Sequence, residues 1–158
     1  MDIASFVGFL LSHILVLLAM EDPMVFINVP SVLIVVGGTI GLMLFSFPLQ
    51  TTLSASRYFG YAFIPPKPRA DNSKVIGELE IGIVYFEKMK SYSQATGWVG
   101  LLIGLILMLE SIDDPATFAK ISAIALLTVL YGTIIAFFYC MPISTKLQCR
   151  LDELKKAS

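Results

Sequence analysis

The stretch AIALLTVLYGTIIAFFYC, residues 123–140, decides the fold because it is apolar along its whole length and carries no charged residue. A transmembrane helix needs about 20 consecutive, mostly apolar residues. The stretch therefore indicates a helix that crosses a membrane. Thr128 places a hydroxyl group at a depth where the helix would be surrounded by lipid, and the functional question is which charge or ion this hydroxyl meets.

The composition of the whole chain agrees with a membrane protein. The 158 residues are 56% hydrophobic and 15% charged, with a mean hydropathy of +0.81, whereas soluble domains are about 25% charged. The net charge of −1 gives no reason to expect binding to nucleic acid. We expect no cofactor and no bound metal, because Cys140 and Cys149 match no ligand spacing and form no disulfide framework.

Four apolar runs are long enough, or nearly long enough, to cross the membrane. Their predicted bounds are Ile3–Met20, Val29–Phe47, Thr96–Leu109 and Ala116–Met141. The start MDIASF has an acidic residue and no basic region, so the first run is interpreted as a permanent span and not as a signal peptide. The predicted fold is an all-α membrane protein with four transmembrane helices, of which spans 3 and 4 extend into the cytoplasm.

The distribution of lysine and arginine predicts the orientation, because these residues concentrate on the cytoplasmic side of membranes. Ten of the eleven lie between spans 2 and 3 or after span 4, and only Lys120 lies near the opposite end. Both termini are therefore expected in the cytoplasm. In this organisation residues 1–50 hold spans 1 and 2, residues 51–95 form a short cytoplasmic segment, residues 96–145 hold spans 3 and 4, and residues 146–158 form a cytoplasmic tail.

The cytoplasmic segment divides at IPPKPRADNS, residues 64–73, whose prolines and polar residues predict a linker. From Lys74 onward, apolar residues recur at helical spacing and predict a helix that runs into span 3. The recurring positions are Ile76, Leu79, Ile83, Phe86, Met89 and Lys90. The charged residues Glu78, Glu80, Glu87 and Lys88 fall mostly elsewhere, as a solvated face or as a contact with a partner.

Small residues recur at steps of three or four in three of the predicted spans. They are Gly37, Gly38 and Gly41 in span 2, Gly97, Gly100 and Gly104 in span 3, and Ser122, Ala125, Thr128, Gly132, Ala136 and Cys140 in span 4. Small side chains allow helices in lipid to approach one another closely. These positions therefore predict spans that pack against protein and not only against lipid.

Several polar side chains lie within the predicted spans, namely Thr128, Thr133, Thr39, Ser12 and His13. A threonine hydroxyl can bond the carbonyl one turn back in its own helix, so a purely local role stays open for each threonine. His13 is interpreted as a packed neutral histidine or one that faces an interface, with a proton relay as the alternative.

Carboxylates are confined to the predicted membrane edges, at Asp2, Glu21, Asp22, Glu110, Asp113 and Asp114, or to the cytoplasmic parts. Machines driven by protons or sodium ions need a titratable or coordinating anion within the membrane. If this chain moves ions, another polypeptide must bring that anion. The small-residue stripe of span 4, with the hydroxyl of Thr128, is a candidate surface for such a partner.

The sequence resembles the MotA/PomA proteins, the channel-forming subunits of the flagellar stator, within the MotA/TolQ/ExbB proton-channel superfamily. The resemblance rests on four blocks: MDIASFVGFLL at the start, NVPSVLIVVGGTIGLMLFSFPLQ at 28–50, GWVGLLIGLILMLESIDDPATF at 97–118 and AIALLTVLYGTIIAFFYCMPISTKL at 123–147. The blocks cover all four predicted spans in order.

The resemblance implies a multi-pass protein of the bacterial inner membrane that forms a pentameric ring around a dimer of a single-span, MotB-like B subunit. The B subunit supplies a membrane Asp, and protonation of that Asp couples ion flow to rotation and torque on a rotor protein. By position, Thr128 matches the family's threonine that faces this Asp. Pro142 matches the proline at the end of span 4, and Gly97, Gly100 and Gly104 match the span-3 glycines.

The departures from the family pattern favour H⁺ over Na⁺ as the transported ion. Two further hydroxyl positions of sodium-driven members are occupied here by Leu101 and Val129. A sodium ion must replace its hydration by several oxygen ligands, which branched alkyl groups cannot provide. With Thr128 and Ala125, these two residues form the predicted ion pathway, while Pro142, the span-3 glycines and Gly132 are predicted to act in structure and coupling.

A second departure is the length of the segment 51–95, which is far shorter than in flagellar stators. This favours, as an alternative, an ExbB/TolQ-like proton-driven engine for a process other than motility. A non-conducting membrane scaffold held by small-residue stripes is a third hypothesis. An enzyme is not expected, because the chain has one histidine, no paired buried carboxylates and no phosphate-binding glycine loop.

Overall fold

The computed structural model describes residues 3–64 and 73–157, and within these ranges the chain contains helices and no strand. The helices in chain order are α1 (Ile3–Leu18), η1 (Pro23–Phe26), α2 (Val29–Val32), η2 (Leu33–Gly37), α3 (Gly38–Ser46), α4 (Leu49–Leu53), α5 (Ala55–Phe63), α6 (Ser73–Glu110), α7 (Pro115–Thr133), η3 (Ile134–Cys140) and α8 (Met141–Ala157). Segment η1 is a 3₁₀-helix, whereas η2 and η3 are stretches of wider π-helix.

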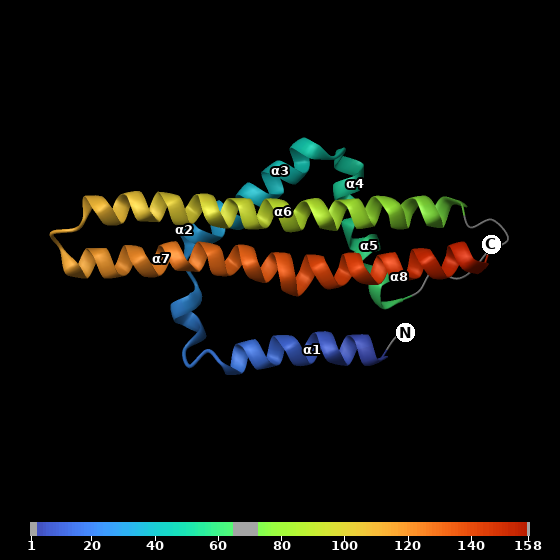
Figure 1. Ribbon diagram of the computed structural model, residues 1–158, viewed down its shortest axis with the longest axis horizontal. Coiled ribbons are helices and arrows are strands. Elements are labelled where there is room, and N and C mark those ends of the chain that lie inside the picture. The colour runs from blue at the N-terminus through green and yellow to red at the C-terminus, as the bar shows by residue number, and fades with distance from the viewer. Residues whose placement is uncertain (1–2, 65–72, 158) are drawn as a thin grey trace.

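Two long antiparallel helices form the spine of the molecule. One is α6, and the other is the continuous helix made by α7, η3 and α8, which lies beside α6 over its length (Figure 1). The turn between them ends at Asp114, whose carboxylate accepts hydrogen bonds from the backbone N–H groups of Ala116 and Thr117, while Pro115 occupies the first helical position. With 38 residues, α6 is about 57 Å long, which exceeds the hydrocarbon thickness of about 30 Å.

The segment α2–η2–α3 crosses this spine obliquely (Figure 1). The Asn28 side chain caps its start by accepting a hydrogen bond from the Ser31 N–H. The start is also held against α7, because the Tyr131 hydroxyl accepts from the Asn28 N–H at 3.1 Å and donates to the Phe26 carbonyl. The helix expected for the second span is present over Val29–Ser46, which ends one residue before the predicted end.

Helix α1 lies apart from the spine and contacts it through aromatic side chains (Figure 1). The Phe9 ring lies 5.9 Å from the Tyr139 ring and 5.6 Å from the Phe63 ring, centroid to centroid. Among the described residues three helices are long and apolar enough to cross a membrane, namely Val29–Ser46, Ser73–Glu110 and the helix that begins at Pro115. The predicted first span is apolar but shorter, with 16 helical residues.

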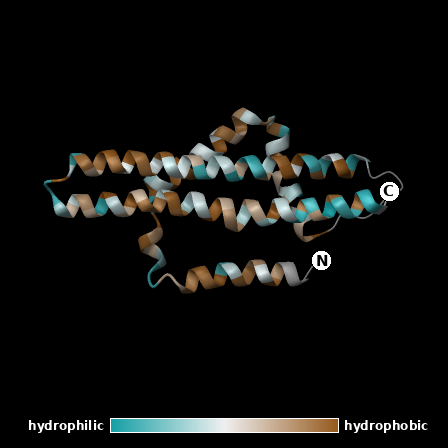
Figure 2. Ribbon diagram, viewed as in Figure 1, coloured by the Kyte–Doolittle hydropathy of each residue, from teal (hydrophilic) through white to brown (hydrophobic). Residues whose placement is uncertain are grey.

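Apolar and charged residues separate along the long helices. Figure 2 shows apolar residues toward the end of α6 and α7 that is joined by the turn, and more polar residues toward the opposite end of α6 and α8. Helix α1 begins, and α8 ends, at this polar end (Figure 1). The helix predicted from Lys74 onward is confirmed, because Leu79, Ile83 and Phe86 are buried and α6 continues without a break into the apolar part.

The polar end has a small core that the sequence did not predict. Helices α4 and α5 precede the predicted linker, and α5 packs Tyr58 and Ala62 against α6 and α8. Gly82 of α6 allows this contact, since a Cβ there would lie 3.1 Å from both Tyr58 Cβ and the Leu147 side chain. Two ion pairs lie at the surface of this core, Arg57 with Glu78 at 3.1 Å and Lys155 with Glu80 at 2.8 Å.

These ion pairs refine the prediction for the charged face of the helix. Glu78 also accepts a hydrogen bond from the Tyr61 hydroxyl at 2.7 Å, so it binds within the chain, whereas Glu87 and Lys88 are exposed. Most of the predicted linker, residues 65–72 with Lys67 and Arg69, lies outside the described residues, as does Asp2.

Candidate functional site

The predicted glycines of span 3 form a closely packed interface with α7. Gly97, Gly100 and Gly104 are buried on one face of α6. A Cβ on Gly97 would lie 3.0 Å from the Thr128 carbonyl oxygen, and a Cβ on Gly104 would overlap the Cβ of Ala125. The two backbones therefore approach to a distance that no larger side chain allows, as small residues permit in membranes.

The facing residues of α7 are the small ones predicted from the sequence. Ala125, Thr128 and Gly132 are buried, and the stripe continues through Ala136 and Cys140, which are also buried. Gly132 lies against α6 so closely that a Cβ would come 2.5 Å from the Ser93 carbonyl oxygen. The prediction that spans 3 and 4 pack against protein is confirmed by this contact within one chain.

The span-2 glycines behave differently. Only Gly38 packs against α6, where a Cβ would lie 2.9 Å from the Thr96 methyl group. Gly37 and Gly41 have open space around them within the described chain. The predicted packing of span 2 therefore holds for one of its three glycines.

Thr128 lies at the centre of the α6–α7 interface with 1% of its surface exposed. Its hydroxyl donates to the Ala125 carbonyl at 2.7 Å and lies 3.2 Å from the Gly97 carbonyl of α6. The local bond to its own helix is thus present, together with a contact to the neighbouring helix. A hydroxyl held between two carbonyls is a fixed dipole in a region of low dielectric constant.

The other predicted pathway residues surround this position to different degrees. Ala125 is buried, whereas Leu101 and Val129 are partly exposed. The side chains of Leu101 and Val129 are alkyl groups, so Thr128 is the only one of the four predicted pathway residues with a side-chain oxygen. Their role in ion movement stays a prediction.

A second pair of hydroxyls, which sequence reasoning did not connect, joins span 2 to α6. The Thr39 and Thr96 hydroxyl oxygens lie 3.2 Å apart, and both residues are buried. Thr39 donates to the Val35 carbonyl at 2.6 Å, and Thr96 lies 3.0 Å from the Ser93 carbonyl. The signal was available, because Ser93, Thr96 and Gly100 follow the helical spacing of the span-3 glycines.

Pro142 lies in the interior of the continuous helix formed by α7, η3 and α8, and its ring is exposed. Proline lacks the N–H that a helix interior requires and its ring crowds the carbonyl four residues earlier. The π-helical segment η3, Ile134–Cys140, immediately precedes it, and π-segments widen the helix locally, often at functional sites. Pro142 therefore marks a break in regular α-helix geometry at the end of the apolar part.

His13 of α1 is held by its own helix and by aromatic rings. Its Nδ1 lies 2.7 Å from the Phe9 carbonyl oxygen, which can only accept, so Nδ1 carries the proton. The Tyr139 and Phe138 rings lie 4.9 and 5.9 Å away. This geometry agrees with the packed histidine at an interface, while its Nε2 is buried with no hydrogen-bond partner among the described residues.

Comparison with known proteins identifies the family. The sequence profile of the MotA/TolQ/ExbB proton channel family matches residues 69–157, which is more than half of the chain and includes α6, α7, η3 and α8. The chain belongs to the MotA/TolQ/ExbB proton channel family. The predicted resemblance is thereby confirmed, and the close α6–α7 interface lies within the matched part.

Two relatives match nearly the whole chain. Chemotaxis protein PomA of Vibrio alginolyticus is 26% identical over 210 residues, which cover 97% of this chain and 83% of PomA. Motility protein A of Aquifex aeolicus is 26% identical over 213 residues, covering 96% of this chain and 84% of the relative. Since these alignments are longer than the 158-residue chain, both relatives contain residues that have no counterpart here.

A third relative matches one part more closely. Motility protein A of Cereibacter sphaeroides is 48% identical over 54 residues, or 34% of this chain. Membership in the family, together with the three long apolar helices, makes the chain a multi-pass membrane protein. The family is one of channels and not of enzymes.

Proposed function

We propose that this chain is the A subunit of a MotA-like stator complex that converts a proton-motive force into rotation or torque for motility. The observation that supports this proposal best is its similarity to PomA and to Motility protein A over nearly the whole chain. The three long apolar helices and the close α6–α7 interface are consistent with a membrane subunit whose core spans pack tightly.

In this proposal the chain crosses the bacterial inner membrane four times, with both termini in the cytoplasm. Helix α1 supplies the first crossing, since its 16 residues are about 24 Å long and can cross with its flanking residues. The polar end is cytoplasmic, because Arg57, Lys88 and Lys155 lie there whereas Lys120 is near the other end. The core of α5, α6 and α8 would then project from the membrane.

The proposed complex requires a partner because the apolar parts of the spans carry no carboxylate. A single-span, MotB-like B subunit supplies the membrane Asp, and copies of this chain form a ring, as a pentamer around a B dimer. Thr128 acts near that Asp through its fixed hydroxyl dipole. In the isolated chain this hydroxyl lies between two helices, so the B-subunit Asp would be influenced through the α6–α7 contact and its carbonyl groups.

The proposed ion is H⁺. A sodium site needs several oxygen ligands, and Leu101 and Val129 supply no side-chain oxygen beside Thr128. A proton needs only the titratable Asp of the partner and a path of polar groups or water.

Co-purification tests this proposal. The full chain, expressed from its native chromosomal locus with an affinity tag, is expected to retain a single-span protein with one membrane Asp. Thr128→Val is expected to impair motility while the complex still co-purifies, and Thr145→Val, which removes an exposed hydroxyl of α8, is the matched control. A complex without such a partner, or full motility of Thr128→Val, would contradict the proposal.

The short connection between spans 2 and 3 favours a second candidate function. Among the described residues, this connection contains only α4, α5 and the first turns of α6, which together with α8 offer a small surface for contact with a rotor. An ExbB/TolQ-like engine that drives another process would need no such contact. Deletion of the gene separates the two functions, because loss of swimming supports the stator and normal swimming supports the alternative.

A further inference from the structure

Lys90 of α6 is the one charged residue among the recurring positions that predicted this helix. Helix α6 contains three lysines, of which Lys74 and Lys88 are exposed and Lys90 is partly buried. Lys90 precedes Gly97 by seven residues, which is nearly two full turns, so both lie on the face of α6 that meets the second long helix. A charge on a packing face is costly unless it has a partner, so the position of Lys90 needs a functional explanation.

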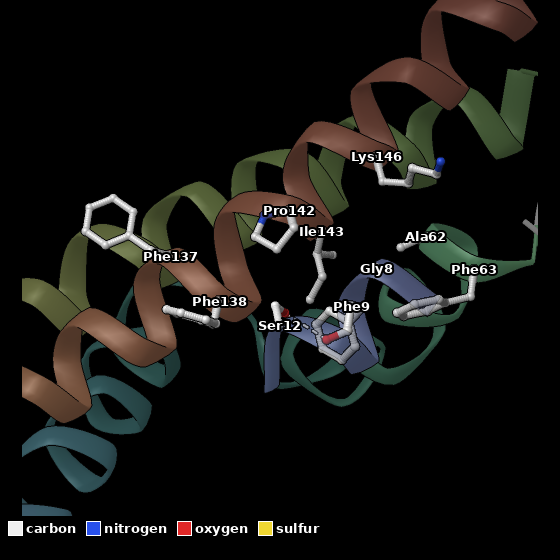
Figure 3. Close-up of a pocket in the computed structure, with 10 residues that line it drawn as sticks. All are labelled: Gly8, Phe9, Ser12, Ala62, Phe63, Phe137, Phe138, Pro142, Ile143 and Lys146. Atoms are coloured by element: carbon white, nitrogen blue, oxygen red, sulfur yellow. Dashed lines mark hydrogen bonds between the residues drawn. The ribbon is translucent and has the colours of Figure 1, made fainter. Parts of the chain in front are cut away.

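The Lys90 ammonium lies over an aromatic ring of the π-helical segment η3, 5.9 Å from the centre of the Phe137 ring. Figure 3 shows that Phe137 and Phe138 project from different sides of this helix. Phe138 contacts α1, with its ring 5.9 Å from the His13 ring. Lys90 precedes Glu110, the last residue of α6, by 20 residues, which is about the length that crosses a membrane. In the proposed topology Lys90 therefore lies at the cytoplasmic edge of the membrane, level with α1.

The charge of Lys90 is not neutralised within the described chain. Among residues 3–64 and 73–157 the ion pairs join other side chains. Glu87, one turn earlier on α6, is exposed and makes no ion pair with Lys90. The buried thiol of Cys140 on η3 is close enough to interact with Lys90, but a protonated thiol carries no charge. A distance of 5.9 Å to Phe137 is near the outer limit of about 6 Å for a cation–π contact. The ammonium is thus held weakly and is available to a carboxylate of another chain.

Lys90 shares a face of α6 with a residue of the predicted ion pathway. Leu101 follows Lys90 by 11 residues, which is three turns or about 16 Å along the helix. Leu101 and Val129 are both partly exposed. Span 2 covers a different side of α6, where the Thr39 and Thr96 hydroxyls are in contact. A partner span that contacts Leu101 therefore meets Lys90 at the cytoplasmic end of the same face.

We propose that Lys90 is the counter-ion of the ionised membrane Asp of the B subunit, with which it pairs once that Asp has released its proton to water on the cytoplasmic side. The inference rests on the proposed function, which supplies the Asp-bearing partner. An ionised carboxylate in apolar surroundings is costly, and an opposite charge within about 4–6 Å favours the ionised form. Lys90 thus favours proton release at the cytoplasmic edge. Protonation of the carboxylate in the next cycle ends the ion pair, and the ammonium returns to the Phe137 ring.

Proton flux into liposomes that contain the chain and the co-purified single-span protein tests this assignment. Lys90→Met keeps an unbranched side chain and removes the charge. Flux is expected to fall about tenfold, since a nearby opposite charge changes the ionisation of a carboxylate by one or more powers of ten. Lys90→Arg, which keeps the charge, is expected to retain most of the flux. Lys88→Met, an equal charge change at an exposed position of α6, is the control and is expected to leave the flux unchanged.

Chemical modification separates the charge from the shape of the side chain. In a chain with Cys140→Ala and Cys149→Ser, Lys90→Cys provides a single thiol. The reagent 2-aminoethyl methanethiosulfonate adds an ammonium to this thiol, and 2-hydroxyethyl methanethiosulfonate adds a neutral group of similar size. Flux is expected to recover severalfold with the first reagent only. The cysteine-free chain that keeps Lys90 is the control, and neither reagent is expected to change its flux.

Flux in Lys90→Met equal to or above that of the unmodified complex would overturn the proposal, as would equal recovery with the charged and the neutral reagent. Loss of the single-span protein from Lys90→Met during co-purification would overturn it too, because Lys90 would then act in assembly. In each of these cases flux through the unmodified complex leaves the proposed function in place. An unmodified complex that contains the partner but shows no flux would contradict the proposed function, and the role of Lys90 with it.

Discussion

Gly100 of α6 and Thr128 of α7 are in direct contact: a Cβ placed on Gly100 would lie 2.7 Å from the Cβ of Thr128. The residue with the predicted functional hydroxyl thus lies within the close contact of the two core helices, between the approaches at Gly104 and at Gly132. Because any change in the separation of α6 and α7 moves this hydroxyl relative to the Gly97 carbonyl, packing and proposed function are coupled at one point.

Gly100→Ala is expected to destabilise the chain by about 1–3 kcal/mol, because the added methyl group must displace Thr128 or separate the helices. The midpoint of unfolding in detergent measures this loss. Gly77→Ala, on the same helix with open space around it, is the control and is expected to be neutral or stabilising by up to about 1 kcal/mol. Equal midpoints for the two variants would contradict the close approach.

Thr128→Val keeps the shape of the side chain and removes the hydroxyl. The loss of stability is expected to be small, about 0.6 kcal/mol, as for other hydrogen bonds between membrane helices. Proton flux through the complex with the B subunit is expected to fall severalfold, and Thr128→Ser, which restores the hydroxyl, is expected to recover most of it. Flux in Thr128→Val equal to that of the unmodified chain would contradict a role of this hydroxyl in ion movement.

Thr96→Val is expected to weaken the contact between span 2 and α6 by about 0.6 kcal/mol, since it removes the 3.2 Å contact with the Thr39 hydroxyl. A double-mutant cycle with Thr39→Val isolates the coupling between the two hydroxyls. Strictly additive losses of stability would show that the two hydroxyls act independently.

Pro142→Ala restores a backbone N–H inside the continuous helix. We expect higher helix stability, because alanine is favoured over proline in a helix interior by about 3 kcal/mol in model systems, and a shift of η3 toward regular α-helix. Hydrogen exchange of Ile134–Cys140 measures this change, which should appear as greater protection. Unchanged exchange would show that packing, and not Pro142, holds the π-segment.

Asp114 is expected to make the turn between α6 and α7 sensitive to acid. The hydrogen bond from the Thr117 side chain, and then those from backbone N–H groups, lower the pKa of this exposed carboxyl below its ordinary value. A lowered pKa in the folded state means that the contribution to stability is full above the unfolded pKa of about 3.9 and is lost as the pH falls through the folded pKa.

The measurement is the thermal midpoint of the protein and of Asp114→Asn between about pH 6 and pH 3. The difference between the two is expected to shrink toward the acid end, because Asn retains the cap but has no charge. Asp113→Asn, an equal charge change next to the cap, is the control. A difference that does not change with pH would contradict the role of the Asp114 charge.

Much of the core could be predicted because lipid imposes simple rules on sequence. The spacing of Gly97, Gly100 and Gly104 predicted the face of α6 that meets α7, since only small residues let membrane helices approach so closely. The long helix from Lys74 into span 3 followed from apolar residues at helical spacing, of which Leu79 and Ile83 are buried.

Other features depend on tertiary contacts that a linear pattern does not contain. Helix α5 was missed because only two of its residues, Tyr58 and Ala62, are buried, and their contacts lie on α6 and α8. The pairing of Thr39 with Thr96 depends on how span 2 crosses α6. The spacing of residues within each helix does not determine this crossing. The stripe with Thr128 was interpreted as a candidate surface for a partner, whereas in the structure it packs against α6. The relation of Thr128 to a second protein depends on the assembly.

Proton flux into liposomes shows whether the chain conducts ions only together with an Asp-bearing partner. The chain is reconstituted alone, with the single-span protein that co-purifies with it, and with that protein after its membrane Asp is replaced by Asn. We expect rapid acidification of the lumen only when the chain and the unmodified Asp-bearing partner are both present. Rapid flux through the chain alone, or flux that the Asp→Asn replacement leaves unchanged, would contradict it.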